Sequence, residues 1–244
     1  TYKIVTALAG LEEGVIKPDT TIFCPGHFRL GRGQYRCWKK SGHGSMNLHD
    51  ALVQSCDVYF YTIGHRLGID VIAEYAKRFG LGRPTRLGLS REKNGLIPTT
   101  QWKLLNKKEP WQLGETISAS IGQGYNLVTP IQQAIMMAAV ANGGTLLKPY
   151  LVKRIEGPDG QVRKEYFPEI TGQIGVNPEH LEQVRMALRG VVNEPRGTGQ
   201  KSRMKNIIVS GKTGTAQVVR MKSNEELEKN EIIPFRYRDH AWFV

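Results

Sequence analysis

Helical and extended sequence patterns are unevenly distributed along this chain of 244 residues. Apolar residues recur at three- and four-residue spacing over about residues 1–13, and Asn47 and Thr129 are well placed to cap further helices. Runs typical of strands occur only after residue 145, at residues 150–155, 162–167 and 207–219. The sequence therefore predicts a mixed α/β (α+β) fold with a helix-rich lobe at about residues 17–145.

Two stretches of that lobe lack a clear helical period. Residues 17–46 are rich in glycine, and residues 81–120 are interrupted by Pro84, Pro98 and Pro110. Proline ends a helix that precedes it, and clusters of glycine favour turns. We therefore expect both stretches to be irregular connections.

The charge balance narrows the classes of partner. Lysine and arginine total 34 against 22 aspartates and glutamates, a net charge of +12. This excess favours an anionic partner such as nucleic acid, a membrane surface or an anionic polysaccharide, although solubility alone also explains it. Nucleic-acid binding is disfavoured because the chain shows no zinc finger with two Cys and two His, no ribonucleoprotein motif and no basic zipper. The longest apolar run, residues 134–141, is far too short to cross a bilayer.

Three short polar motifs follow one another along the chain: Lys3, Ser55-Cys56-Asp57 and Lys212-Thr213-Gly214. A lysine one helical turn after a serine points its amine toward the serine hydroxyl, where the neutral amine can act as a general base. Ser55 and Asp57 can hold that amine and relay protons. The plainer alternative is that Ser55 and Asp57 only cap the helix that follows them.

The third motif suits a substrate that carries a carboxylate. Lys212 supplies a cation and Thr213 a hydroxyl, while Gly214, which has no side chain, lets a substrate lie against the strand. The backbone N–H of Thr215 can point at a developing oxyanion. If Lys3 is the lysine of a Ser-x-x-Lys motif, the serine nucleophile of that motif stands immediately before Thr1. We therefore expect either that the chain is truncated at that point or that this serine is chemically modified.

The motifs and their flanks resemble one enzyme family over nearly the whole chain. A Ser-x-x-Lys, Ser-x-Asn/Asp and Lys-Thr/Ser-Gly series marks penicillin-binding proteins and serine β-lactamases. The chain is most similar to the transpeptidase domain of the elongation-specific class B penicillin-binding proteins of Gram-negative bacteria, the penicillin-binding protein 2 group. The stretches that carry this similarity are residues 35–44 (YRCWKKSGHG), 55–61 (SCDVYFY), 121–125 (IGQGY), 129–132 (TPIQ) and 210–217 (SGKTGTAQ).

The resemblance implies both a fold and a reaction. The fold is an antiparallel sheet flanked by helices, with an all-helical lobe and the active site between the two. The reaction is D-Ala-D-Ala transpeptidation through a serine acyl-enzyme, which β-lactams block. The sheet of the family uses strands before the nucleophile helix and after Val244, so we expect residues 1–244 to form a transpeptidase domain that is incomplete at both ends. The alternative is a non-catalytic β-lactam sensor or a peptidoglycan-binding scaffold of the same fold.

The resemblance also implies partners and a location. The expected partners are peptidoglycan stem peptides, β-lactams, a glycosyltransferase and the proteins of the elongation complex. The expected location is the periplasmic side of the inner membrane, with a membrane anchor outside this chain. No organic cofactor and no nucleic acid are expected.

Three cysteines and a histidine form a separate series: Cys24, Cys37, His43 and Cys56. An odd number of cysteines cannot be fully paired within the chain. Three thiolates and one imidazole would complete a closed tetrahedral zinc site, and His43 lies between two glycines in a long loop that has little else to hold it. A single disulfide with one free cysteine and three unrelated buried thiols remain the alternatives. The resemblance favours zinc in a structural role, because some relatives carry a zinc site here with mixed Asp, His and Cys ligands.

Overall fold

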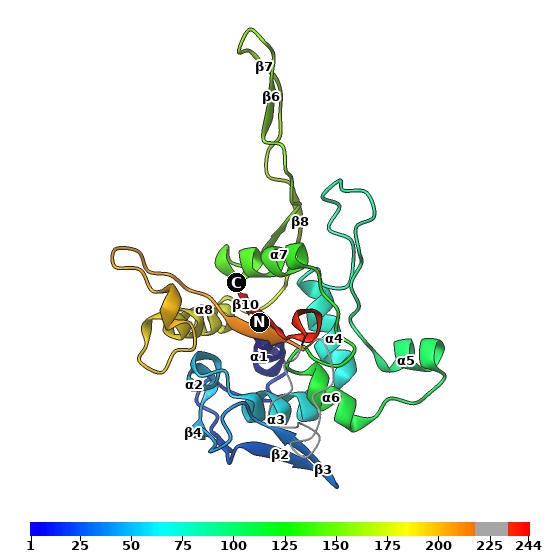
Figure 1. Ribbon diagram of the computed structural model, residues 1–244, viewed down its shortest axis with the longest axis vertical. Helices are drawn as coiled ribbons and strands as arrows, with labels where there is room; N and C mark the ends of the chain where they lie inside the picture. The colour runs from blue at the N-terminus through cyan, green and yellow to red at the C-terminus, as the bar shows by residue number, and fades with distance from the viewer. Residues whose placement is uncertain (218–233) are drawn as a thin grey trace.

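The computed structural model describes residues 1–217 and 234–244 (Figure 1). Its centre is helix α1 (Lys3–Glu12), in which every residue from Lys3 to Leu11 is buried. A helix that is apolar on all sides must lie inside the protein. Three helices pack around it, α3 (Asp57–Leu67), α4 (Ile69–Arg78) and α8 (Pro178–Asn193). The first residues of the chain are therefore fixed by the core itself.

The described residues hold four further α-helices: α2 (Leu48–Val53), α5 (Thr100–Lys107), α6 (Leu113–Ala119) and α7 (Pro130–Ala141). The predicted caps are confirmed, since Asn47 accepts from the Asp50 N–H and Thr129 forms a reciprocal capping box with Gln132. The prediction that residues 81–120 are irregular was wrong, because this stretch contains α5 and α6. The mixed α and β fold class is confirmed.

The described residues form five two-stranded antiparallel sheets. The paired strands are β1 (Ile22–Cys24) with β4 (Gly44–Met46), β2 (His27–Leu30) with β3 (Gly33–Arg36), β5 (Thr145–Leu147) with β8 (Ile170–Gln173), β6 (Arg154–Glu156) with β7 (Val162–Glu165), and β9 (Thr213–Ala216) with β10 (His240–Phe243). Residues 17–46 were predicted to be a loop, yet they hold four of these strands. The strand predicted at residues 207–219 is limited to β9 within the described residues, and residues 218 and 219 lie outside them.

The β9–β10 ribbon lies directly beside the start of α1 (Figure 1). Gly214 is paired with Trp242 and Thr213 with Phe243. The ribbon is anchored to α8, where the Gly211 N–H donates to the Leu188 carbonyl at 3.1 Å. The backbone nitrogen of Thr1 lies 3.5 Å from the Thr213 carbonyl oxygen. Two segments more than 200 positions apart in the sequence therefore meet at the amino end of α1.

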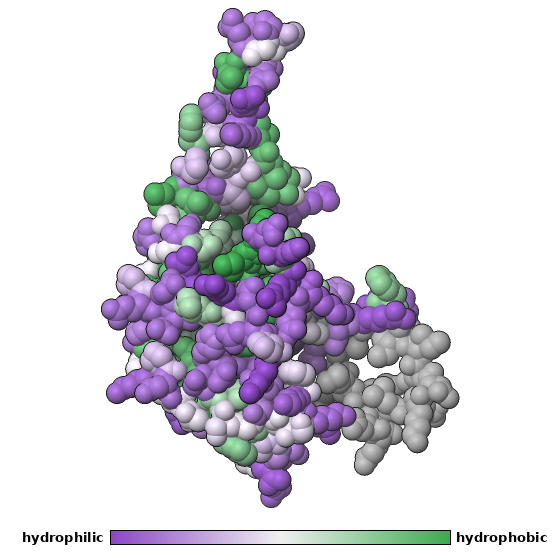
Figure 2. All heavy atoms as spheres, turned by 90° about the vertical axis from the view of Figure 1, so that its left-hand side faces the viewer, coloured by the Kyte–Doolittle hydropathy of each residue, from purple (hydrophilic) through white to green (hydrophobic). Residues whose placement is uncertain are grey.

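The β6–β7 hairpin extends away from the body of the protein as a long arm (Figures 1 and 2). Its strands pair in antiparallel fashion across a turn at residues 158–160. Exposed apolar side chains run along the arm and its base, among them Leu151 and Phe167. Within residues 1–217 and 234–244, no helix has the length and apolar character needed to cross a membrane.

Candidate active site

Lys3 is the centre of a buried polar network. Its ammonium donates to the Asp57 carboxylate at 2.6 Å, to the Ser55 hydroxyl at 3.0 Å and to the Ser55 carbonyl at 2.8 Å. Lys3 is only 6% exposed and Asp57 only 9%. Burying two charges is costly unless they are paired and hydrogen-bonded, and this arrangement meets both conditions. The network therefore joins the first two sequence motifs into one site.

The backbone at Ser55 is strained, and Trp38 holds this segment in place. Ser55 has a φ of +54°, which is unfavourable for a residue with a Cβ atom and is common at functional sites. The Trp38 backbone N–H donates to the second Asp57 oxygen at 2.8 Å, and the Trp38 indole N–H donates to the Ser55 carbonyl at 3.0 Å. The capping alternative does not hold for Ser55, because Cys56 is the N-cap of α3 and Ser55 faces Lys3.

Lys212 lies on the other side of the site and is fully buried. Burial lowers the pKa of its ammonium to about 7, with the nearby Lys3 adding to the effect and Asp57 opposing it. Its amine donates to the Thr213 carbonyl at 3.3 Å. At neutral pH this lysine is therefore close to its titration point, and an anion bound beside it would favour the charged form.

Gly214 and Thr215 line an open cleft of about 280 Å³ together with Thr1, Gln123 and Trp242. A Cβ atom added at Gly214 would lie only 3.0 Å from the Thr1 nitrogen, so this position has almost no room for a side chain. The Gln123 amide donates to the Thr215 carbonyl at 2.8 Å and so links the cleft wall to β9. Among the described residues β9 pairs only with β10, which leaves its other edge toward the cleft.

The structure brings Lys3, Ser55, Asp57, Lys212 and Gly214 together around the amino end of α1. Thr213 lies beside them, and its hydroxyl is hydrogen-bonded to the Thr198 hydroxyl at 2.7 Å. Sequence reasoning missed Trp38, Gln123 and Thr198 as members of this site. Trp38 and Gln123 lie in stretches that carry the family similarity, but the sequence alone does not reveal which partners these three side chains contact.

The cysteine series is also brought together. The ligand atoms of Cys24, Cys37, His43 and Cys56 all lie within 4.8 Å of one another, and the three thiols are buried. Two backbone hydrogen bonds build the cluster: the Cys37 N–H donates to the Gly26 carbonyl and the His43 N–H to the Cys24 carbonyl. The three cysteines are free thiols, so the structure does not form the disulfide kept as an alternative.

The spacing of these ligand atoms fits a tetrahedral metal ion. His43 Nδ1 lies 3.6 Å from Cys24 Sγ and 3.4 Å from Cys37 Sγ. Zinc bonded tetrahedrally to one nitrogen and one sulfur would separate these two atoms by about 3.6 Å. A hydrogen bond from the Cys56 thiol lowers the pKa of Cys37 to about 5, whereas the pKa of Cys56 is raised by the same contact. The donor set therefore fits zinc.

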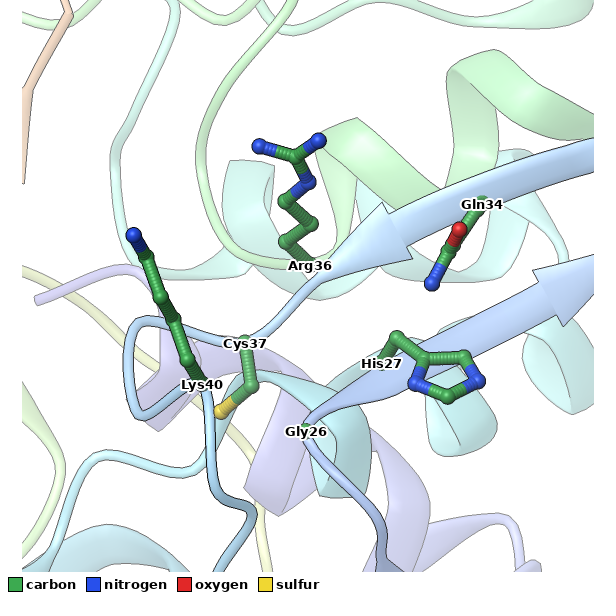
Figure 3. Close-up of a pocket in the computed structure, with 6 residues that line it drawn as sticks. All are labelled: Gly26, His27, Gln34, Arg36, Cys37 and Lys40. Carbon is green, nitrogen blue, oxygen red and sulfur yellow. The ribbon is translucent and has the colours of Figure 1, made fainter. Parts of the chain in front are cut away.

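A small basic pocket of about 220 Å³ adjoins this cluster at Cys37 and is lined by residues of β2, of β3 and of the segments beside them (Figure 3). Arg36 and Lys40 line it, and Figure 3 shows the Cys37 sulfur pointing away from the Arg36 guanidinium. The three cysteines are buried, and Cys56 places the cluster one residue away from both Ser55 and Asp57.

Comparison with known proteins agrees with this geometry. The family model of the penicillin-binding protein transpeptidase domain matches residues 1–244. Peptidoglycan D,D-transpeptidase MrdA of Haemophilus influenzae is 39% identical over 254 residues, which cover 100% of this chain and 38% of that protein. The chain thus spans less than half the length of this curated relative.

Two solved structures of relatives are also similar. The crystal structure of Pseudomonas aeruginosa PBP2 in complex with WCK 5153 superposes with a TM-score of 0.83 at 37% identity, over 100% of this chain and 51% of that one. Helicobacter pylori PBP2, solved in complex with MreC, gives a TM-score of 0.81 at 30% identity, over 99% and 41% of the two chains. This chain belongs to the penicillin-binding protein transpeptidase family.

Proposed function

We propose that this domain is the catalytic part of a peptidoglycan D,D-transpeptidase that cross-links stem peptides during cell elongation. The observation that carries the proposal is the buried contact of Lys3 with Ser55 and Asp57, placed opposite Lys212 and Gly214 around the amino end of α1. A general base, a proton relay, a carboxylate-binding cation and an open strand edge are the parts that acyl transfer requires. The similarity to MrdA and to penicillin-binding protein 2 supports the same activity.

In the proposed reaction a serine immediately before Thr1 attacks the penultimate D-Ala carbonyl of a stem peptide. Lys3 first gives a proton to the Asp57 carboxylate, and the neutral amine then accepts the serine hydroxyl proton while a C–O bond forms and the C–N bond to the terminal D-Ala breaks. That leaving amine takes up a proton through the Lys3, Ser55 and Asp57 network. An amine of a neighbouring stem peptide then attacks the ester: a C–N bond forms, the C–O bond to the serine breaks, and a proton of the amine passes through Lys3 to the serine oxygen. Lys212 and Thr213 hold the terminal carboxylate, and the Thr215 N–H faces the oxyanion.

The test of this proposal is acylation of the full-length protein by a fluorescent penicillin, followed by electrophoresis. We expect one covalent label per protein and slow release of the label, because a transpeptidase deacylates the β-lactam poorly. Release of D-Ala from a stem-pentapeptide substrate separates an enzyme from a non-catalytic sensor, which would be labelled without releasing D-Ala. A protein that is neither labelled nor active on the pentapeptide would contradict the proposal.

The pKa of Lys212 predicts a pH effect on acylation. The ammonium is needed to bind a carboxylate, and its pKa of about 7 means that the free enzyme loses this charge as the pH rises through 7. We therefore expect the second-order acylation rate to fall by roughly tenfold per pH unit above this value. Lys212→Arg keeps the charge at every pH studied, so its profile should lack this falling limb. An identical falling limb in the variant would assign it to another group.

We also propose that Cys24, Cys37, His43 and Cys56 hold a structural zinc ion. The support is the closeness of the four ligand atoms and the match of the His43 distances to tetrahedral zinc. Four protein ligands leave no open position, so the ion would fix the fold and take no part in the reaction. Its place beside Ser55 and Asp57 suggests that it holds the segment that carries them.

The proposed activity places the domain on the periplasmic side of the inner membrane, where cross-linking takes place. A membrane anchor outside this chain, a glycosyltransferase and proteins of the elongation complex are the proposed partners. The Helicobacter pylori relative was solved in complex with MreC, which supports a partner of that kind. The net charge of +12 suits an anionic polymer and an anionic membrane nearby.

A further inference from the structure

Three aromatic side chains beside the cleft form a cluster that the proposed chemistry does not use. The ring centroids of Trp102 and Tyr125 lie 5.1 Å apart, and those of Trp111 and Tyr125 lie 6.3 Å apart. All three residues are half-buried and none belongs to the hydrophobic core. We call Trp102, Trp111 and Tyr125 the aromatic platform.

A buried ion pair holds the platform together. Lys103 is only 2% exposed and donates to Glu115 at 2.6 Å, which ties α5 to α6. Trp102 is the neighbour of Lys103 on α5, while Trp111 precedes α6 and Tyr125 follows it. Helix α5 is unusual because its buried residue is this lysine, whereas Leu104 and Leu105 are 57% and 59% exposed. The helix therefore serves to position surface groups instead of filling the core.

The platform is continuous with the catalytic cleft. Every residue of the segment 121–128 except Tyr125 lines the cleft, and the Tyr125 ring packs instead against Trp102 and Trp111. Gln123, two positions earlier, is hydrogen-bonded to the Thr215 carbonyl of β9. The segment 121–128 therefore forms part of the cleft wall and also contributes Tyr125 to the aromatic platform.

We infer that the aromatic platform binds a sugar ring of the glycan strand to which the stem peptide is attached. The C–H groups on one face of a pyranose pack against an aromatic ring, while its hydroxyl and amide groups bind polar neighbours. The platform offers both, since exposed Gln112 follows Trp111 in sequence and exposed Asn106 donates to the Trp102 carbonyl at 2.8 Å. Rigid aromatic rings give a large contact area at a low cost in side-chain entropy. This inference rests on the proposed function, because it assumes a substrate whose peptide is linked to glycan.

The test uses a sugar without peptide, so that binding at the cleft does not contribute. Chitotetraose, an oligomer of N-acetylglucosamine, is added to the full-length protein and binding is followed by saturation-transfer difference NMR. We expect Trp102→Ala and Tyr125→Ala each to weaken binding about tenfold or more. Phe167→Ala is the matched control, because it removes an exposed aromatic ring at the base of the arm, and its affinity should equal that of the wild type.

Acylation by fluorescent penicillin, measured on the same samples, separates this inference from the proposed function. Penicillin carries no glycan, so the platform variants should be labelled at the wild-type rate, which also shows that they are folded. Equal chitotetraose affinity in the wild type and both platform variants, or no binding by the wild type, would overturn the inference and leave the proposed function standing. Failure of the wild type to be labelled would count against the proposed function alone.

Discussion

Replacing Lys3 with methionine is expected to reduce the rate of acylation by fluorescent penicillin by about a thousandfold. General base catalysis is worth about 10² to 10⁴ in rate, and Lys3, the first residue of α1, is the proposed base. The substitution also leaves the Asp57 carboxylate buried without its partner at 2.6 Å. An uncompensated buried charge costs about 3 to 5 kcal/mol of stability. The loss of rate must therefore be separated from a loss of folded protein.

Lys3→Arg makes that separation. The guanidinium keeps a positive charge beside Asp57 but does not give up a proton near neutral pH. We expect this variant to unfold at nearly the wild-type temperature and to be acylated as slowly as Lys3→Met. Labelling at the wild-type rate by a folded Lys3→Arg protein would show that another group accepts the serine proton. Thermal unfolding followed by circular dichroism provides the folding control.

The helices that could be predicted from the sequence are those with local signals at their ends. Asn47 and Thr129 cap α2 and α7 as expected, because capping depends only on the neighbouring three or four residues. Helices α5 and α6 carried the same kind of signal. Thr99 caps α5, and Gln112 with Glu115 forms a capping box at α6. We predicted an irregular stretch because of the nearby prolines, but these prolines lie outside both helices.

Helix α5 shows a second reason for the failed prediction. Amphipathic patterns identify a helix when its apolar side chains face the core. In α5 the core-facing residue is Lys103, and the leucines point to solvent. The short strands of residues 17–46 are equally hard to predict, because strand β1 exists only through its pairing with β4, some twenty residues away. Pairing between strands that are distant in the sequence cannot be recognised from a short stretch of residues.

The candidate site could be predicted in its residue types but not in its electrostatics. The motifs identified Lys3, Asp57 and Lys212 because their chemistry follows from side-chain type and spacing. The pKa of Lys212 follows instead from burial, which depends on how β9 packs against the rest of the protein. Likewise the Trp38 contact with Asp57 requires the β2–β3 hairpin to fold back on α3.

Removing the proposed zinc ion should have the second large effect. In Cys24→Ser protein we expect metal analysis to fall from about one zinc per chain to less than about 0.2, because sulfur is the preferred ligand. A metal bound about a thousandfold more tightly than its free concentration contributes about 4 kcal/mol, which corresponds to roughly 10 °C in melting temperature. Cys56 is joined to Ser55 and Asp57, so the loosened segment should also slow acylation by about a hundredfold.

His27→Ala is the matched control for this prediction, because His27 lines the adjoining pocket without belonging to the cysteine cluster. It should keep its zinc, its melting temperature and its acylation rate. Purified wild-type protein that contains no metal and shows a Cys24–Cys37 disulfide by mass spectrometry would rule out the zinc proposal. The catalytic proposal would survive that result, because the contacts of Lys3 with Ser55 and Asp57 involve none of the four ligand side chains.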